Sequence, residues 1–168
     1  MKKEEIKVLH LISSSGFLGA ENVVLELAKQ SRAAGHRATI GVFENQRNPH
    51  LELAEAAAAE GLSVQIFPCR GRWDKKTLRM IKDYINKENI QIIHSHNYKS
   101  NFYARVALSG NNIRWVVSNH GRRTGYRLLI YNLLNLLVLR RADKIIAVSE
   151  KIAEQMKHAG INKEKICV

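Results

Sequence analysis

The chain has 168 residues, of which 45% are hydrophobic and 25% are charged. This length suits one domain of roughly 100–200 residues, and the composition excludes collagen-like, disordered and disulfide-scaffold proteins. The charge is uneven: residues 1–69 hold 7 Lys and Arg against 8 Asp and Glu, whereas residues 70–168 hold 20 against 7, which gives −1 and +13 and the total of +12. A basic surface of this kind suits an anionic partner, namely nucleic acid, a membrane face or a phosphorylated substrate.

The predicted elements alternate between apolar runs typical of buried strands and segments with apolar residues at helical spacing. In chain order, a strand is predicted at 7–12, a helix at 20–34, a strand at 38–43, a helix at 51–60, a strand at 63–67 and a helix at 74–87. The order continues with a strand at 90–94, a helix at 99–108, a strand at 113–118, a helix at 126–139, a strand at 144–148, a helix at 149–160 and a strand at 165–168. Gly35 is a typical helix stop, and Asp74 and Ser149 are typical N-caps.

This alternation predicts an α/β fold: a Rossmann-like, doubly wound parallel sheet of six to seven strands with helices on both faces. The nearly continuous apolar strands agree, because a parallel strand is covered on both sides. The run at 165–168 resembles a strand that begins as the sequence stops, with no helix after it. We therefore expect residues 1–168 to be one domain of a larger protein.

The two cysteines, Cys69 and Cys167, lie far apart and fit no zinc-binding or CxxC pattern. Both are expected to stay reduced, which makes the cytoplasm the simplest location. The N-terminus lacks the long apolar region of a secretory signal, and no run approaches the roughly 20 apolar residues of a membrane-spanning helix. We expect a protein that is soluble or at most peripheral to a membrane.

Ligands of open parallel sheets bind beyond the carboxyl ends of the strands, and the first such end is followed by a glycine-containing loop. Gly16 and Gly19 let the backbone approach a ligand, and the helix start at Ala20 and Glu21 offers free N–H groups to a phosphate or a sugar oxygen. The spacing matches neither GxGxxG nor GxxxxGK[ST]. The alternative is a turn that simply admits the helix.

The fourth predicted strand ends in His94-Ser95-His96-Asn97. Two histidines at this spacing share a strand face and could bind a metal, but no carboxylate or cysteine beside them completes a ligand set. We predict no metal site here. Instead, one histidine packs inside while His96 or Asn97 lies at the edge of the cleft.

The fifth predicted strand leads into Ser118-Asn119-His120-Gly121. A histidine at the carboxyl end of a strand, followed by glycine, is well placed to bond a ligand hydroxyl or phosphate. An isolated loop histidine that caps a helix is the alternative, and the position favours the ligand.

Four motifs together resemble one family. Gly19-Ala20-Glu21 is similar to the GGAE element of GT-B-fold, family-four-like retaining glycosyltransferases. Three further segments resemble that family's iiHsH, HG and aVSe signatures in order and at similar separations: Ile92-Ile93-His94-Ser95-His96, His120-Gly121 and Ala147-Val148-Ser149-Glu150. The resemblance covers nearly the whole chain and corresponds to the family's N-terminal, acceptor-side domain.

The resemblance implies transfer of a sugar, with retention, from a nucleotide-sugar donor in a cleft between two domains, without metal or cofactor. His120 would be catalytic, near the transferred sugar. The resemblance and the strand-end positions give these substrate-binding residues: Gly16, Gly19, Ala20, Glu21, His96, Asn97, Gly121, Ser149 and Glu150. Leu18 replaces the first glycine of GGAE. The family's C-terminal nucleotide-sugar-binding domain is absent from this chain, so we expect the fragment alone to be inactive.

Basic residues surround an apolar segment in the second half of the chain. The helix at 126–139 is too short to span a bilayer and is either an interfacial anchor or a helix buried against the sheet, which we favour. Residues predicted to contact a membrane or an anionic glycolipid acceptor are Arg70, Arg72, Trp73, Lys75, Lys76, Arg122 and Arg123. For Arg70, Arg72, Trp73, Lys75 and Lys76 the alternative is a solvated helix face, which the residues alone favour.

Nucleic acid is the rival partner for the same charge, but aromatic residues make up only 7% of the chain, and no RNP motif or zinc finger is present. We therefore predict half of a cytoplasmic enzyme, either soluble or peripheral at the inner membrane face, that transfers sugar to a saccharide or lipid-linked acceptor in cell-envelope glycan synthesis. The alternatives are a nucleotide-sugar epimerase of the same fold and a non-catalytic module that binds lipid or nucleic acid.

Overall fold

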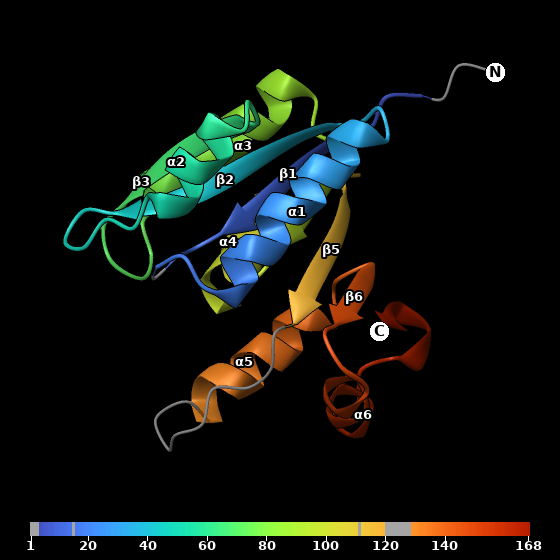
Figure 1. The fold of residues 1–168 in the computed structure, drawn as a ribbon. Helices are drawn as coiled ribbons and strands as arrows, with labels where there is room; N and C mark the ends of the chain where they lie inside the picture. The colour runs from blue at the N-terminus through green and yellow to red at the C-terminus, as the bar shows by residue number, and fades with distance from the viewer. Residues whose placement is uncertain (1–3, 15, 111, 120–128) are drawn as a thin grey trace.

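The computed structural model describes residues 4–14, 16–110, 112–119 and 129–168 (Figure 1). The strands are β1 (Lys7–Ile12), β2 (Arg37–Asn45), β3 (Ser63–Cys69), β4 (Ile92–Ser95), β5 (Arg114–Asn119), β6 (Lys144–Ala147) and β7 (Ile166–Cys167). The helices are α1 (Gly19–Ala33), α2 (Glu52–Ala59), α3 (Lys75–Glu88), α4 (Tyr98–Ala107), α5 (Leu129–Leu139) and α6 (Glu150–His158), with a 3-10 turn at Lys163–Lys165.

All strand pairs are parallel, and the strand order is β3-β2-β1-β4-β5-β6-β7. This confirms the predicted doubly wound, Rossmann-like sheet. The chain winds outward from β1 in one direction and from β4 in the other, so the winding reverses between these two strands. Such a switch point leaves a crevice at the carboxyl ends of the strands.

The buried residues form two hydrophobic clusters, one on each face of the sheet. Along β1, Leu9 and Leu11 belong to one cluster and Ile12 to the other, because successive strand side chains alternate between faces. Helices α1 and α2 cover one cluster through residues such as Val24 and Leu53. Helices α3 to α6 cover the other cluster (Figure 1). Helices therefore lie on both faces, as predicted.

Most strands differ by one or two residues from their predicted bounds, and the differences in β3 and β4 have a clear physical cause. The sequence predicts that Pro68 ends β3, but the strand continues through it. Because β3 lies at the edge of the sheet, the missing N–H of proline removes no hydrogen bond between interior strands. β4 begins at Ile92 rather than Ile90. The N–H of Ile90 instead donates to the carbonyl of Ile85, and Asn89 adopts a left-handed conformation that ends α3.

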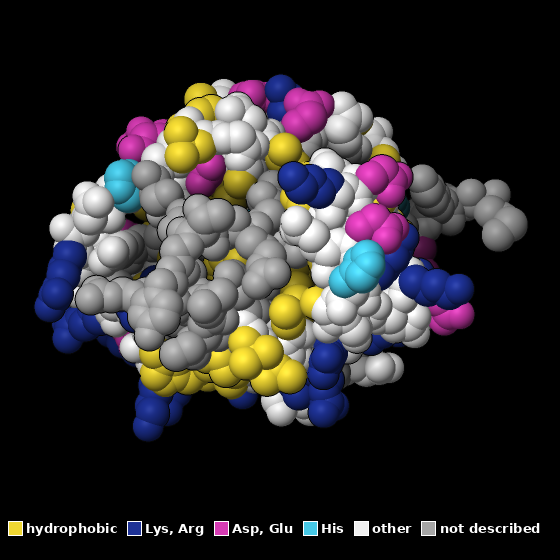
Figure 2. Space-filling view, turned by 90° about the horizontal axis from the view of Figure 1, so that it is seen from below, with side chains coloured by type: hydrophobic (Ala, Val, Ile, Leu, Met, Phe, Trp, Pro, Cys, Tyr) yellow, Lys and Arg dark blue, Asp and Glu magenta, His cyan; other side chains and the backbone are white. Residues whose placement is uncertain are grey.

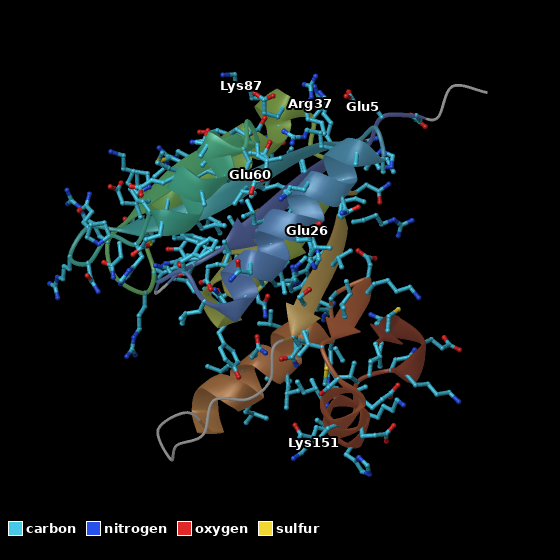
Figure 3. All side chains as sticks on the ribbon, in the orientation of Figure 1. Glu5, Glu26, Arg37, Glu60, Lys87 and Lys151 are labelled. Carbon is cyan, nitrogen blue, oxygen red and sulfur yellow. The ribbon has the colours of Figure 1, made fainter. Side chains whose placement is uncertain are left out.

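The outer faces of the helices carry charged side chains, shown in Figure 3. Lys29 of α1 lies 2.8 Å from the carboxylate of Glu60 and 3.8 Å from that of Glu26, and the two glutamates are labelled in the figure. Such solvent-exposed pairs typically contribute about 0–1 kcal/mol. The two buried clusters, rather than these surface pairs, therefore account for the stability of the sheet.

Within the described part of the chain, no helix has both the length and the apolar character that crossing a membrane requires.

Candidate functional site

A polar cleft of about 420 Å³ lies where β1, β4 and β5 end. Its walls come from three loops and from the first turns of α1 and α4, and they include Ser13, His96, Asn97, Ser118 and Asn119. The cleft therefore occupies the switch point between β1 and β4. It brings together side chains from all three strand ends that the sequence singles out.

The loop after β1 is fastened to the start of α1 by Glu21. Oε1 of Glu21 accepts a hydrogen bond from the Ser14 hydroxyl at 3.0 Å, and Oε2 accepts one from the N–H of Leu18 at 3.1 Å. Glu21 is buried although it is an acidic residue. It also lines the cleft together with Ala20, so its carboxylate shapes the loop on which a ligand would rest.

The two glycines of this loop have different settings. Gly16 has φ +137°, a conformation that side-chain-bearing residues rarely adopt. Gly19 is the first residue of α1, and a Cβ added there would meet no atom within 4 Å. The backbone therefore requires glycine only at Gly16, which agrees with a simple turn. The ligand contact that the sequence predicts for both glycines stays a prediction.

Asn97 connects two walls of the cleft. Its Oδ1 accepts a hydrogen bond from the N–H of Ser100 at 3.1 Å and so caps α4, while its Nδ2 donates to the carbonyl of Ser13 at 2.8 Å. Asn97 also lines the cleft with His96, as predicted for the edge of this strand end. One side chain therefore fixes the loop after β1 relative to the loop after β4.

Three buried histidines lie beneath the cleft. Nδ1 of His10 is 3.4 Å from Nε2 of His96, and Nε2 of His94 is 2.9 Å from the Ser118 hydroxyl. The sequence prediction missed His10, which pairs with His94 in the sheet. Its signal was a histidine within an otherwise apolar strand. Burial lowers the pKa of His10 to about 4, so this imidazole is neutral near pH 7.

These three histidines also form the one group in the described residues with the ligand spacing of a metal site. One nitrogen from each lies within 4.8 Å of the others. A hydrogen bond between His10 and His96 explains why these two rings lie close together, and His94 is hydrogen-bonded to the Ser118 hydroxyl. The predicted lack of a metal remains a prediction.

A chain of polar side chains, absent from the predicted site, runs from the core to the cleft. The Trp115 indole donates to the Ser95 hydroxyl at 2.9 Å, and that hydroxyl donates to Oδ1 of Asn101 at 2.7 Å. Nδ2 of Asn101 donates to Oδ1 of Asn135 at 3.0 Å, which connects α4 to α5. Asn101 and Asn135 both line the cleft. Isolated asparagines on apolar helices gave the only sequence signal for them.

The remaining predicted site residues lie elsewhere. Ser149 is the N-cap of α6, and its hydroxyl accepts a hydrogen bond from the N–H of Ile152. Glu150 is exposed at the first position of α6, and neither residue is among those that line the cleft. Their binding role stays a prediction. The predicted residues outside the described part of the chain are His120, Gly121, Arg122 and Arg123.

The basic residues of the loop after β3 lie beside the cleft. Arg70 is held by Gln46, whose Oε1 accepts a hydrogen bond from its Nε at 3.0 Å. Arg72 and Trp73 line a second, apolar groove. Lys75 and Lys76 are exposed in the first turn of α3. The five residues lie within the loop after β3 and the first turn of α3, and their contact with a membrane or an acceptor stays a prediction.

Helix α5 packs against the core along one side, as the favoured buried helix predicts, but its other side is exposed. Leu139 is fully buried, and Leu136 and Val138 pack against the core. Leu133 and Leu137, however, are 60% and 50% exposed. The apolar run is longer than the face that the sheet can cover, because only one side of a surface helix meets the core.

Comparison with known proteins assigns the family. The profile of Glycosyltransferase Family 4 matches residues 18–168. A search of the curated proteins gave no match.

Solved structures share the fold at low identity. Anabaena Alr3699/HepE, in complex with UDP and glucose, has a TM-score of 0.80 and 19% identity over 98% of this chain and 44% of its own. The lipopolysaccharide outer core galactosyltransferase WaaB has a TM-score of 0.68 and 16% identity over 97% and 45%. A putative UDP-N-acetylglucosamine 2-epimerase from Listeria monocytogenes has a TM-score of 0.69 and 15% identity over 98% and 45%.

The chain therefore spans less than half the length of these proteins. What it shares with them is the N-terminal half of a GT-B fold. With the profile match over most of its length, the chain belongs to Glycosyltransferase Family 4.

Proposed function

We propose that this chain is the acceptor-side half of an enzyme that transfers a sugar, with retention, from a nucleotide-sugar donor to a saccharide or lipid-linked acceptor. One observation carries the proposal: a family-four chain has a polar cleft at the switch point between β1 and β4. In a doubly wound fold this is where ligands bind. The donor is a substrate, and no further cofactor is part of the proposal.

Most of the hydrogen-bonding side chains that line the cleft are neutral, and such groups suit the hydroxyls of a sugar. Ser13, Asn97 and Asn119 line it with hydroxyl or amide side chains. The N-terminus of α1 faces the same space through Ala20 and Glu21, and free N–H groups at a helix start favour a phosphate. We assign the donor phosphates or the reacting sugar to the Gly16–Gly19 loop, and the transferred sugar to His120.

Similar proteins support a nucleotide-sugar donor and an envelope product. HepE is described as a complex with UDP and glucose, and WaaB as a lipopolysaccharide outer core galactosyltransferase. We extend both features to this chain: a uridine-diphosphate sugar as donor, and a cell-envelope glycan as product. We place the enzyme in the cytoplasm, peripheral at the inner membrane face, where the basic residues after position 69 would meet anionic lipid.

A nucleotide-sugar epimerase is the second candidate, favoured by the fold likeness to the putative Listeria enzyme. An epimerase acts on the donor alone, whereas a transferase also needs an acceptor. The same cleft would serve either reaction, so product analysis has to decide between them. A non-catalytic module that binds lipid or nucleic acid is the third candidate.

The test is turnover of a panel of nucleotide sugars by the full-length protein, with and without added saccharide and glycolipid acceptors. Transfer predicts that free nucleotide accumulates together with glycosylated acceptor, and only when an acceptor is present. A changed sugar still attached to the nucleotide, formed without acceptor, would indicate the epimerase. No turnover of any donor would indicate the non-catalytic module.

A further inference from the structure

An apolar groove lies directly beside the polar cleft. We propose that it binds the hydrocarbon chain of a lipid-linked acceptor, with the acceptor phosphate held by Arg72 and Lys99. The proposal rests on the proposed function and makes it narrower, because it names the acceptor class. The groove has a volume of about 350 Å³, within the range of small-molecule sites.

The walls of the groove are hydrophobic side chains that the fold leaves uncovered. Trp73, Phe102 and Leu134 line it and are 41%, 45% and 53% exposed. Val138 of α5 completes the apolar lining. Figure 2, which views the molecule from the side of α5 and α6, shows hydrophobic side chains gathered on this face with Lys and Arg side chains beside them. Contiguous exposed apolar surface of this kind marks a binding surface.

Contacts among the lining residues and with their neighbours hold the groove in shape. The ring of Trp73 lies 5.1 Å from Phe102 and 5.2 Å from Tyr103. The Tyr103 hydroxyl accepts a hydrogen bond from the N–H of Asp74 at 2.7 Å, and Lys99 Nζ donates to the carbonyl of Gly71 at 2.9 Å. The loop that carries Trp73 is therefore fixed to α4, and the site is preformed, which lowers the entropic cost of binding.

The groove and the cleft share part of their lining. Tyr98, Lys99 and Asn135 belong to both. A ligand with its polar end in the cleft could therefore extend an apolar chain into the groove without leaving the protein. A water-soluble saccharide would have no use for this second compartment, whereas a lipid-linked saccharide would fill both.

The charge around the groove complements a phosphate. Arg72 and Lys99 line it, and no carboxylate is among its described lining residues. Arg70, Lys75 and Lys76 lie in the same loop and helix start. In a lipid-linked acceptor the phosphate lies between sugar and hydrocarbon, and Lys99 lies between cleft and groove. Because of this match, the occupant we propose for the groove is a single phosphate-linked lipid rather than a bilayer surface or a second copy of the chain.

The test uses dodecyl phosphate, below its micelle concentration, as a probe of the full-length protein. Tryptophan fluorescence reports binding, because Trp73 lines the groove while Trp115 is only 3% exposed. A Trp73→Phe variant supplies the background signal. Leu134→Glu places a carboxylate in the groove. Leu137→Glu is the matched control, since Leu137 is equally exposed on the same helix but does not line the groove.

We expect saturable binding that Leu134→Glu weakens by roughly tenfold or more, because the hydrocarbon chain would have to cover a carboxylate. Leu137→Glu should leave binding unchanged. Lys99→Gln should weaken binding of dodecyl phosphate more than binding of neutral dodecyl maltoside, which has no phosphate for the Lys99 ammonium to hold. Equal losses for the two glutamate variants, or binding only to anionic vesicles, would overturn the proposal in favour of a membrane face. If a variant loses dodecyl phosphate binding because its self-association changes, as measured by sedimentation, the groove is a dimer contact and the proposal is overturned.

Binding of UDP, measured on the same samples, separates this proposal from the proposed function. A protein that binds UDP and transfers sugar, yet ignores dodecyl phosphate, contradicts only the lipid groove. A protein that binds dodecyl phosphate but turns over no nucleotide sugar contradicts the transferase instead.

Discussion

The side-chain amide of Asn97 donates a hydrogen bond of 2.8 Å to the carbonyl of Ser13, across 84 positions of the chain. This contact joins the loops after β1 and β4, which are the two strands that flank the switch point. The relative position of two cleft walls therefore depends on one side chain, which also caps α4.

Asn97→Asp separates these two tasks. An aspartate keeps the oxygen that caps α4 but places a second oxygen against the Ser13 carbonyl instead of the N–H. We therefore expect a loss of roughly 1 kcal/mol of stability and a raised KM for substrate in the full-length enzyme. Asn97→Ala loses both contacts and should also cost about 1 kcal/mol of stability, as N-cap removal does. Urea unfolding and steady-state kinetics measure the two effects. Wild-type KM in Asn97→Asp would show that the contact to Ser13 does not organise the cleft.

Glu21→Gln tests the fastening of the loop after β1. The amide can accept only one of the two hydrogen bonds that Glu21 accepts from Ser14 and Leu18, and we expect a loss of roughly 1 kcal/mol of stability together with weaker donor binding. Glu26→Gln, on the exposed side of the same helix, is the control. Equal stability and equal UDP affinity in the two variants would contradict the role of Glu21.

His10 predicts a pH dependence of stability. Its pKa is about 4 in the folded protein, below the 6.5 of an ordinary histidine, because burial disfavours the charged ring. Between pH 6.5 and 4 the unfolded chain binds a proton that the folded chain does not, so stability is full above pH 6.5 and falls by about 3 kcal/mol toward pH 4.

Urea unfolding across this pH range measures the effect. His10→Gln should flatten the dependence, whatever its stability at pH 7, while the exposed His158→Gln should retain it. If the unfolding free energy of His10→Gln changes with pH as steeply as that of wild type, groups other than His10 cause the pH dependence.

Gly41→Ala tests the packing at the centre of β2. The added methyl would lie 3.0 Å from both Leu9 Cδ1 and Phe67 Cε2, and overpacking of this kind costs about 1–3 kcal/mol. Gly19→Ala, where the methyl meets no atom within 4 Å, should unfold at the wild-type urea concentration. Equal stability of the two variants would show that the packing around Gly41 leaves room for a methyl group.

Much of the fold could be predicted from the sequence because parallel strands are apolar throughout and their helices have clear spacing. The order of the strands was not predicted, because alternation along the chain does not say which strands pair. The ends of β3 and β4 were wrong because they depend on where Pro68 lies in the sheet and on which carbonyl the N–H of Ile90 meets. Neither contact can be read from neighbouring residues.

The cleft was predicted in outline, since polar residues after β1, β4 and β5 must meet at one edge of the sheet. Its supporting contacts were not. His10 reaches His96 only through the pairing of β1 with β4, and Trp73 meets Phe102 only because the loop after β3 folds onto α4. The groove arises from contacts between residues far apart in sequence, so no local pattern indicates it.

The measurement that tests the central claim most directly is kcat for sugar transfer by the full-length enzyme carrying His120→Ala. His120 follows Asn119, the last residue of β5, which lines the cleft. If the cleft is where the sugar is transferred, kcat falls by roughly 100-fold or more, as loss of a positioned catalytic side chain does, while the melting temperature stays at the wild-type value. Wild-type kcat in a folded His120→Ala variant would contradict the claim.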